Sequence, residues 1–275
     1  MTPPNVAPPN VAIIIPARYQ STRYPGKPLA LVKGAAGLSK PLIQRSYEAA
    51  IKVQGVKSVH IATDSEEIRA VAKDFGADVI MTPPSCENGT ARCAAALLQR
   101  SDISADIIVN WQGDALLTPP YFIEAIIARL TMRPGAMIAT PAIRCNQEHY
   151  RKLIAEERAG RVGGTSVVFG ENQQALYFSK RLIPYLSAAR QEQDPPFAFL
   201  HIGVYAYRRE SLLRYVDLKP SILEEYEGLE QLRFLHHHIP VDIAEVHPPE
   251  WEIWELNNPS DIVPIENALK IMGAA

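Results

Sequence analysis

The sequence predicts an α/β fold in which a doubly wound, mostly parallel sheet carries helices on both faces. Short apolar runs recur at residues 11–15, 59–63, 79–81 and 107–111, and such runs are typical of strands buried on both faces. Segments with apolar residues at helical spacing separate these runs, as the crossover connections of a parallel sheet require. The length of 275 residues suits one domain of enzyme size, with or without a smaller appended lobe.

Strands and helices alternate along the chain. The predicted strands are residues 11–15, 59–63, 79–81, 107–111 and 203–207. The predicted helices are residues 41–51, a segment capped by Ser65, and residues 90–98, 119–130 and 223–235. We expect Pro16 to end the first strand. Residues 1–10 are rich in proline and lack a cationic segment, so they predict an extended tail rather than a signal peptide.

Composition excludes several classes of protein. The formal net charge of −2 argues against a nucleic-acid partner and against an electrostatic membrane anchor. No apolar run is long enough to span a bilayer, so no membrane partner is expected. Cys86, Cys93 and Cys145 are odd in number and lack zinc-type or C-x-x-C spacing, which favours reduced thiols in a cytoplasmic protein.

The loop after the first predicted strand concentrates positive charge. It carries Arg18, Arg23 and Lys27 together with Ser21 and Gly26. Side-chain cations, a hydroxyl and backbone donors in one loop suit the oxygens of a polyphosphate. The alternative is a solvated basic loop, because neither the Walker pattern G-x-x-x-x-G-K-[ST] nor a G-x-G-x-x-G fingerprint is present.

Polar residues follow four of the predicted strands. Ligands of doubly wound sheets bind beyond the carboxyl ends of the strands, so we expect these loops to face one crevice. The residues concerned are Arg18, Ser21, Lys27, Asp64, Gly89, Thr90, Arg92, Gln112, Gly113 and Asp114. Asp114 follows a glycine at a strand end, where a carboxylate suits Mg²⁺. The alternative role of Asp114 as a helix cap is weaker, because the next helix is predicted to begin near Pro119.

Several sequence blocks carry a family resemblance. They are ARYQSTRYPGKPL at 17–29, ATD at 62–64, NGTAR at 88–92, NWQGD at 110–114, ALYFSKRLIP at 175–184, HIGVYAYR at 201–208 and LEQLR at 229–233. In order and spacing these blocks resemble the 3-deoxy-manno-octulosonate cytidylyltransferases, also called CMP-Kdo synthetases. The resemblance covers nearly the whole chain. The co-occurrence of ARYQSTR, QGD and LEQLR is more specific than any single block.

The resemblance implies a nucleotide-diphospho-sugar transferase-like fold and the transfer of CMP from CTP to an acidic acceptor. The acceptor would be Kdo or a related 3-deoxy-ulosonic acid, pyrophosphate would leave, and Mg²⁺ would be required. The implied domain is residues 11–275, divided into a nucleotide-binding half at 11–142, a smaller α+β lobe for the acceptor and for dimerisation at 143–250, and a C-terminal return segment at 251–275. A homodimer is also implied.

The resemblance assigns roles to individual residues. Arg18, Lys27 and Asp114 would be catalytic, and Asp114 would bind the metal. The nucleotide would be bound by Ala17, Arg18, Ser21, Lys27, Asp64, Gly89, Thr90, Arg92 and Gln112. The acceptor would be bound by His201, Tyr205, Glu230 and Gln231, although the acidic helix that carries the last two would otherwise be read as a solvated face.

The chain departs from the family pattern in the acceptor and second-metal regions. Asn257 stands where the family has a metal-binding aspartate, and an amide supplies no negative charge, so a second metal ligand there is in doubt unless Glu255 or Asp261 compensates. Ala115 replaces a glutamate, Lys180 an arginine, and Ser166 a lysine. The arginine that the family carries after an I-P dipeptide is also not evident after Pro184. The changes at Lys180, at Ser166 and after Pro184 reduce the cationic contacts to an acceptor carboxylate, so the acceptor could differ from Kdo itself.

Other functions stay open at this stage. One is a cytidylyltransferase for another small acid such as a phosphonate, and another is a glycosyltransferase that uses a sugar nucleotide. The stretch QGDAL carries a single acid where a glycosyltransferase should have D-x-D. A non-catalytic nucleotide-binding relative is the third alternative, favoured only by Asn257.

Overall fold

The computed structural model describes residues 8–20, 24–192 and 196–274, and its central element is a large mixed sheet. The strands are β1 (Val11–Ala17), β4 (Val56–Thr63), β5 (Asp78–Met81), β6 (Ile107–Asn110), β7 (Ile138–Arg144), β8 (Ser166–Phe169), β9 (Ala175–Ser179), β10 (Phe199–His201), β11 (Tyr205–Arg208) and β12 (Val241–Val246). Their order is β5-β4-β1-β6-β11-β7-β10-β8-β9, with β12 paired to β7. A separate hairpin pairs β2 (Leu31–Lys33) with β3 (Ser39–Pro41).

Most parallel pairs of the sheet lie in the first half of the chain, and β12 from the second half adds one more by pairing in parallel with β7. β5, β4, β1 and β6 are parallel, whereas β11 runs antiparallel to β6 and β7. The α/β fold class is confirmed, and the parallel sheet continues into antiparallel strands from the second half. Because β11 enters against β6, its first residue, Tyr205, pairs with Asn110, the last residue of β6. The start of β11 therefore lies at the carboxyl edge of the parallel strands.

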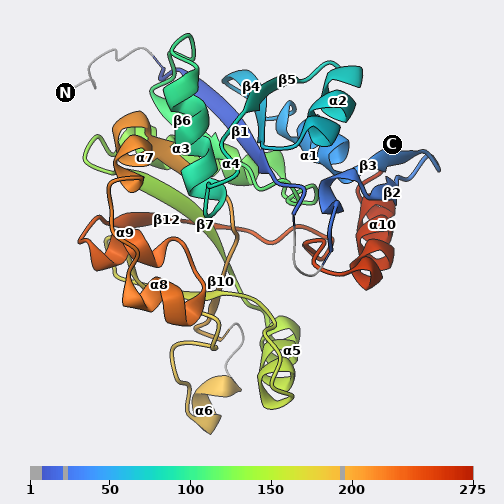
Figure 1. Ribbon diagram of the computed structural model, residues 1–275. Coiled ribbons are helices and arrows are strands. Elements are labelled where there is room, and N and C mark those ends of the chain that lie inside the picture. The colour runs from blue at the N-terminus through green and yellow to red at the C-terminus, as the bar shows by residue number, and fades with distance from the viewer. Residues whose placement is uncertain (1–7, 21–23, 193–195, 275) are drawn as a thin grey trace.

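Helices cover both faces of the sheet (Figure 1). On one face lie α1 (Leu42–Ala50), α2 (Glu66–Asp74) and α4 (Pro120–Met132). On the other lie α3 (Gly89–Gln99), α7 (Arg209–Tyr215) and α9 (Leu232–His236). The remaining helices are α5 (Gln147–Arg158), α6 (Ala188–Gln191), α8 (Ile222–Glu227) and α10 (Ile262–Ile271), with short 3₁₀ turns η1 (Lys27–Leu29) and η2 (Pro259–Asp261).

β1 shows why the apolar runs lack alternation. Ile13 and Ile15 pack with α1, α2 and α4, while Ala12 and Ile14 pack on the opposite face with α3. All four side chains are buried, so both strand faces contribute to the core. Burial of an isoleucine side chain stabilises the fold by about 1.5–3 kcal/mol. A strand that is buried on both faces therefore gains from an apolar residue at every position rather than at every second one.

The first strand is longer than predicted. Pro16 does not end β1, which continues to Ala17 and pairs there with Thr63. The pairing of β1 with β6 ends earlier, at Ile14 and Asn110. Pro16 therefore lies beyond the last residue of β1 that pairs with β6. Its lack of an N–H group removes no hydrogen bond between these two strands.

The helix predicted at residues 223–235 is in fact two helices. α8 ends at Gly228, whose φ of 61° is left-handed, and α9 begins at Leu232. A left-handed residue interrupts the helical hydrogen bonds and suits glycine, which lacks a Cβ. Glu230 and Gln231 consequently lie in the break between the helices rather than on a regular helical face.

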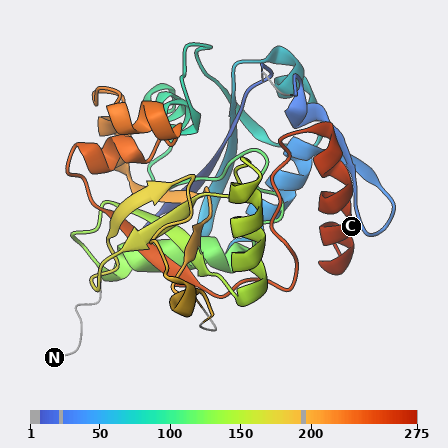
Figure 2. The ribbon, with the colours of Figure 1, turned by 90° about the horizontal axis from the view of Figure 1, so that it is seen from below.

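The C-terminal segment returns to the first half of the chain. α10 lies beside the β2–β3 hairpin, seen from two directions in Figures 1 and 2. Leu256, Ile265 and Leu269 form a separate buried cluster with Val32 and Leu116. Residues 255–261 thereby reach the carboxyl edge of the sheet. Among the described residues, no helix has the length and apolar character needed to cross a membrane.

Candidate functional site

A cavity of about 900 Å³ opens at the carboxyl edge of the parallel strands. Its walls come from the loops after β1 and β6, the start of α3, the segment from β10 to β11, the break between α8 and α9, and the C-terminal segment. The predicted site residues that line it are Ala17, Arg18, Lys27, Gly89, Arg92, Gln112, Asp114, His201, Tyr205, Glu230, Gln231 and Asn257. The residues predicted for the nucleotide and for the acceptor thus share one cavity.

Lys27 and Asp114 are in direct contact. Lys27 Nζ donates to Asp114 Oδ2 at 2.5 Å, and the two side chains are 22% and 15% exposed. α4 has Pro119 at its N-cap, so Asp114 does not cap that helix. A cation from the loop after β1 and a carboxylate from the loop after β6 therefore meet in the cavity, 87 residues apart in sequence.

The loop that carries Asp114 is held closely against β1. The hydroxyl of Ser46 donates to the carbonyl of Gly113 at 2.7 Å, and Ala115 N donates to the Gln112 carbonyl at 2.9 Å. A Cβ at Gly113 would lie 2.9 Å from the Pro16 carbonyl oxygen. Only glycine fits this approach of two backbones without a shift.

Arg18 and Arg92 are the other predicted nucleotide cations on the cavity wall. Arg18 is exposed there. Arg92 is buried, and its guanidinium donates to Asp64 at 2.9 Å and to the hydroxyl of Thr82 at 2.7 Å. These contacts fix the guanidinium before any ligand binds. Ser21 lies outside the described residues.

Asp64 and Thr90, which were also predicted to contact the nucleotide, are not among the residues that line the cavity. Asp64 instead pairs with Arg92. Thr90 is fully buried, with its hydroxyl oxygen 3.0 Å from that of Tyr207. Both residues lie at a strand or helix end, where they make supporting contacts with Arg92 and Tyr207.

Gly89 and Gln112 fit each other closely. Gln112 Nε2 donates to Asn110 Oδ1 at 3.2 Å, which orients the amide. A Cβ at Gly89 would lie 2.7 Å from Gln112 Nε2. The absence of a side chain at Gly89 therefore allows the amide of Gln112 to face the start of α3, where the nucleotide pocket was predicted.

His201, which was predicted to contact the acceptor, lines the cavity as a neutral side chain. Burial lowers the pKa of His201 to about 3. Its Nε2 lies 2.8 Å from the hydroxyl oxygen of Thr140, and that oxygen also lies 2.8 Å from the Val204 carbonyl. If the single Thr140 proton is donated to Val204, Nε2 must be the protonated nitrogen of His201. Nδ1 is then left as a hydrogen-bond acceptor.

Glu230 and Gln231 face the same end of the cavity from the break between the two helices. Thr90 N donates to Glu230 Oε2 at 3.4 Å, and desolvation raises the pKa of the Glu230 carboxyl above its usual value. Gln231 is 3% exposed, and its Nε2 has no hydrogen-bond partner in the structure. A buried donor without a partner is costly, and an acceptor oxygen from a ligand would satisfy it.

The oxygen donors of the cavity fit a magnesium ion that is shared with a phosphate-bearing ligand. Asp114, Asn257 and Asp261 all line the cavity, and carboxylate and amide oxygens are hard donors that suit Mg²⁺. Asp261 Oδ2 already accepts from the backbone N–H groups of Asn257 and Asn258, at 2.9 and 2.6 Å. Within the described part of the chain no group of three acidic, histidine or cysteine side chains could hold a metal. A metal here would need oxygens from the ligand.

Further cavity residues were not predicted as site residues. They include Glu87, Asn88, Gly163, Gly164 and Trp254. Lys180 and Glu255, which the comparison with the family pattern had named, also line the cavity. The adjacent glycines are the one signal that could have indicated the wall at Gly163 and Gly164, where a Cβ on Gly164 would lie 3.1 Å from Leu200 Cδ2. The Lys180 side chain passes close to Gly228, where a Cβ would lie 2.8 Å from Lys180 Nζ. The absence of a side chain at Gly228 therefore leaves room for Lys180 in the cavity wall.

A mixed α/β sheet with cations, a carboxylate and a tight glycine loop at its carboxyl edge defines a nucleotide-dependent transferase. Residues 12–242 match the family model described as cytidylyltransferase. A 3-deoxy-manno-octulosonate cytidylyltransferase of Maricaulis maris is 38% identical over 264 residues, covering 96% of this chain and 98% of the relative. An 8-amino-3,8-dideoxy-manno-octulosonate cytidylyltransferase of Shewanella baltica is 35% identical, covering 95% of this chain and 99% of the relative.

A solved structure gives the same result. The chain is similar to a CMP:2-keto-3-deoxy-manno-octonic acid synthetase in complex with CTP, with a TM-score of 0.78, 32% identity, and coverage of 96% of this chain and 98% of that one. The chain therefore belongs to the cytidylyltransferase family, on the branch that includes the 3-deoxy-manno-octulosonate enzymes. It is a CTP-dependent nucleotidyltransferase.

Proposed function

We propose that the protein transfers CMP from CTP to Kdo or a closely related 3-deoxy-ulosonic acid, with release of pyrophosphate. The observation that carries this proposal is the contact between Lys27 and Asp114 inside a cavity that also contains His201, Glu230 and Gln231. A phosphate-binding group, a metal-binding group and a separate polar end are what a transfer between a nucleotide and a sugar acid requires.

The reaction joins an acceptor oxygen to the α-phosphorus. A hydroxyl oxygen of the acceptor attacks, the bond from the α-phosphorus to the bridging oxygen breaks, pyrophosphate leaves, and the hydroxyl proton passes to solvent or to a nearby base. Such transfers depend on in-line positioning and on neutralising charge at the phosphoryl oxygens. Arg18 and Lys27 supply that positive charge, and the fixed guanidinium of Arg92 holds the wall beside the nucleotide.

Mg²⁺ is the proposed cofactor. Asp114 would hold it, with Asn257 as a weaker second ligand because an amide is uncharged. When bound, the ion would neutralise charge on the phosphate oxygens and on the leaving pyrophosphate. Lys27 is then free to turn from Asp114 towards the triphosphate, since a flexible ammonium redirects its donors readily.

The acceptor end suits a polar acid. Among the described residues the Lys180 ammonium has no ion-pair partner, and it stands where the resembling family carries an arginine. His201 stays neutral through the ordinary pH range and Gln231 offers an unsatisfied donor. These groups favour a carboxylate and hydroxyls over an apolar ligand. The 8-amino relative makes an amino-substituted octulosonate the second acceptor to test.

We also propose a homodimer in the cytoplasm. The supporting observation for assembly is the outer strand β9, which is an edge of the large sheet and exposes 67% of Leu176. An apolar side chain on an open edge strand is a feature that proteins usually cover. Cys86, Cys93 and Cys145 are free thiols, which suits a reducing compartment.

Pyrophosphate release measures this function directly. Each of the four nucleoside triphosphates should be combined with Kdo, its 8-amino analogue and a small phosphonate, in the presence of Mg²⁺. We expect release with CTP and an octulosonate, and little with the other nucleotides. Release only with the phosphonate would show that the proposed acceptor is wrong. No release with any pair of nucleotide and acceptor would contradict the proposed reaction. A sugar-nucleotide-dependent transferase is disfavoured, because Gln112 and Leu116 stand two residues before and after Asp114, where a D-x-D motif would need a second aspartate.

A further inference from the structure

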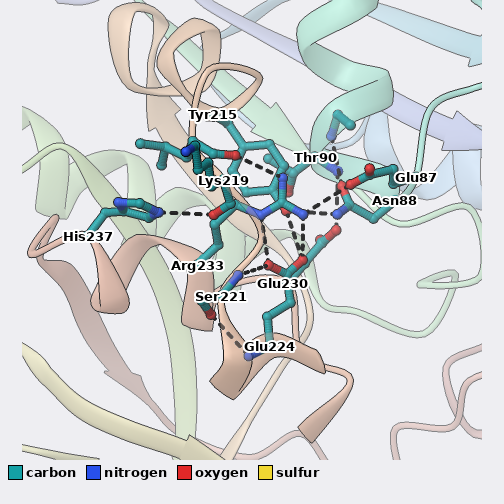
Figure 3. Close-up of polar contacts among 12 residues, drawn as sticks. Glu87, Asn88, Thr90, Tyr215, Lys219, Ser221, Glu224, Glu230, Arg233 and His237 are labelled. Atoms are coloured by element: carbon teal, nitrogen blue, oxygen red, sulfur yellow. Dashed lines mark hydrogen bonds and ion pairs between the residues drawn. The ribbon is translucent and has the colours of Figure 1, made fainter. Parts of the chain in front are cut away.

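A buried arginine joins two walls of the cavity. Arg233, in α9, is 5% exposed, and its Nε and Nη2 donate to the two oxygens of Glu224, at 2.7 and 2.8 Å. Nη2 also donates to Glu87 at 3.1 Å (Figure 3). Glu224 belongs to α8, whereas Glu87 belongs to the loop that leads into α3. One guanidinium therefore holds carboxylates from both halves of the chain.

A second connection runs through Tyr215. The guanidinium of Arg233 lies 4.4 Å from the centroid of the Tyr215 ring. The hydroxyl of Tyr215 accepts from Asn88 Nδ2 at 2.7 Å, and Asn88 Oδ1 caps α3 by accepting from Ala91 N at 2.9 Å (Figure 3). The first turn of α3 is thus tied to the same arginine by a cation–π contact and a hydrogen bond.

The groups at both ends of this network line the cavity, but Arg233 does not. Glu87 and Asn88 lie on the nucleotide side, next to Gly89 and its contact with Gln112. Glu230 and Gln231 lie on the acceptor side, directly before α9. The capping box of α8, in which Ser221 and Glu224 bond each other's backbone N–H groups, keeps Glu224 in place.

We propose that Arg233 is a positioning residue that couples the nucleotide wall of the cavity to its acceptor wall. A ligand that orders the loop at Glu87 and Asn88 then also fixes the positions of Glu230 and Gln231, because the guanidinium of Arg233 connects that loop to α8 and α9. This inference rests on the proposed function in taking the nucleotide to bind beside Gly89 and Gln112 and the acceptor to bind beside Glu230 and Gln231. These contacts need an arginine, because its planar guanidinium presents several N–H donors at fixed angles. A lysine ammonium is a point charge and cannot bond both carboxylate oxygens of Glu224 and also an oxygen of Glu87 with the same geometry.

Amide hydrogen exchange with CTP and Mg²⁺, in the absence of any acceptor, tests the coupling. In the wild-type protein we expect CTP to slow exchange at residues 86–92 and also at residues 222–236. In Arg233→Lys the protection at 86–92 should remain, and the CTP-dependent protection at 222–236 should fall by about fivefold or more. Glu87→Ala, which removes the Arg233–Glu87 contact and leaves the Asn88–Tyr215 hydrogen bond, should lose part of the same protection.

Arg129→Lys is the matched control. Arg129 donates to the buried carboxylate of Asp242 at 3.0 Å and lies away from the cavity. Its substitution should lower stability while leaving the CTP-dependent protection at 222–236 intact. If Arg233→Lys behaves like this control, or if CTP protects only 86–92 in the wild-type protein, the coupling is wrong. If CTP protects neither segment of the wild-type protein, the nucleotide site is misplaced and the coupling falls with it.

Steady-state kinetics supply an independent reading. Arg233→Lys should raise KM for the octulosonate acceptor by about fivefold and change kcat less, because the acceptor wall is displaced while the phosphate contacts persist. A fall in kcat with unchanged acceptor KM would overturn the assignment to the acceptor wall. Failure of the wild-type protein to turn over any acceptor would instead count against the proposed acceptor, and the exchange experiment would still decide on the coupling.

Discussion

At the scale of single residues, the site depends on Asp114. Its carboxylate is the acidic group that contacts Lys27, and the glycine before it lets the loop approach β1. The proximity of Lys27 and Asp114 was predictable, because carboxyl ends of adjacent parallel strands meet at one edge. The burial of Thr90 and the pairing of Asp64 with Arg92 were not, because they depend on how α3 packs.

Asp114→Asn keeps the shape of the side chain and removes its charge. We expect kcat to fall by about a hundredfold or more, because phosphoryl transfer would lose the proposed metal ligand. The midpoint of thermal unfolding should change by only a few degrees, since the side chain is not part of the core. Near-normal kcat in a pyrophosphate-release assay would show that another acid binds the metal.

Gly113→Ala tests the close approach of the loop to β1. The new Cβ would lie 2.9 Å from the Pro16 carbonyl oxygen, so one of two backbones must move. We expect kcat/KM for CTP to fall by about tenfold or more, because small displacements of a catalytic group are costly. Gly135→Ala is the control, since its Cβ would meet nothing within 4 Å. Equal kcat/KM values for the two variants would refute the argument.

His201 predicts a pH dependence of stability. Burial lowers its pKa to about 3, whereas the unfolded chain titrates near the ordinary value of 6.5. The unfolded state then binds the extra proton first, so the contribution of His201 is complete above pH 6.5 and is lost as pH falls towards 3, by up to ~1.4 kcal/mol per pH unit. Urea unfolding of wild type and His201→Gln at pH 7, 5 and 4 should show their difference shrinking at low pH. A constant difference would contradict this.

At the scale of elements, the α8–α9 break is the main correction to the sequence prediction. The apolar spacing at 223–235 fits one helix, and an isolated glycine within a helical pattern is tolerated. The left-handed φ of Gly228 decides otherwise, and Lys180 from β9's end occupies the space that a side chain would need. Periodicity reports which residues are buried, but it does not show where a tertiary contact interrupts the helix.

Gly228→Ala tests the purpose of the break. Left-handed backbone costs an alanine about 1–2 kcal/mol, and the new Cβ would lie 2.8 Å from Lys180 Nζ. Because the end of Lys180 is flexible, it should move away rather than unfold the protein. We expect KM for the acceptor to rise severalfold, because the proposed contact between Lys180 and the acceptor carboxylate, worth about 1 kcal/mol, would be lost. KM for CTP should stay nearly unchanged. An unchanged acceptor KM would exclude Lys180 from the acceptor site.

At the scale of the whole molecule, one sheet carries both ends of the site. The parallel strands deliver Arg18, Lys27 and Asp114 at their carboxyl ends. The antiparallel β11 begins at that same edge, so His201 and Tyr205 reach it from the second half of the chain. The sequence predicted the parallel half and its loops. The walls at Glu87 and at Gly163 and Gly164 depend on long-range packing, which local patterns do not encode.

In the proposed reaction Lys27 and Asp114 serve one metal-bound CTP. A crystal structure with CTP and Mg²⁺ tests it most directly. We predict Mg²⁺ on the Asp114 carboxylate and on phosphate oxygens, with Lys27 and Arg18 on the triphosphate and the base beside Gln112. A triphosphate bound elsewhere, with Lys27 still paired to Asp114 and no metal there, would contradict the claim.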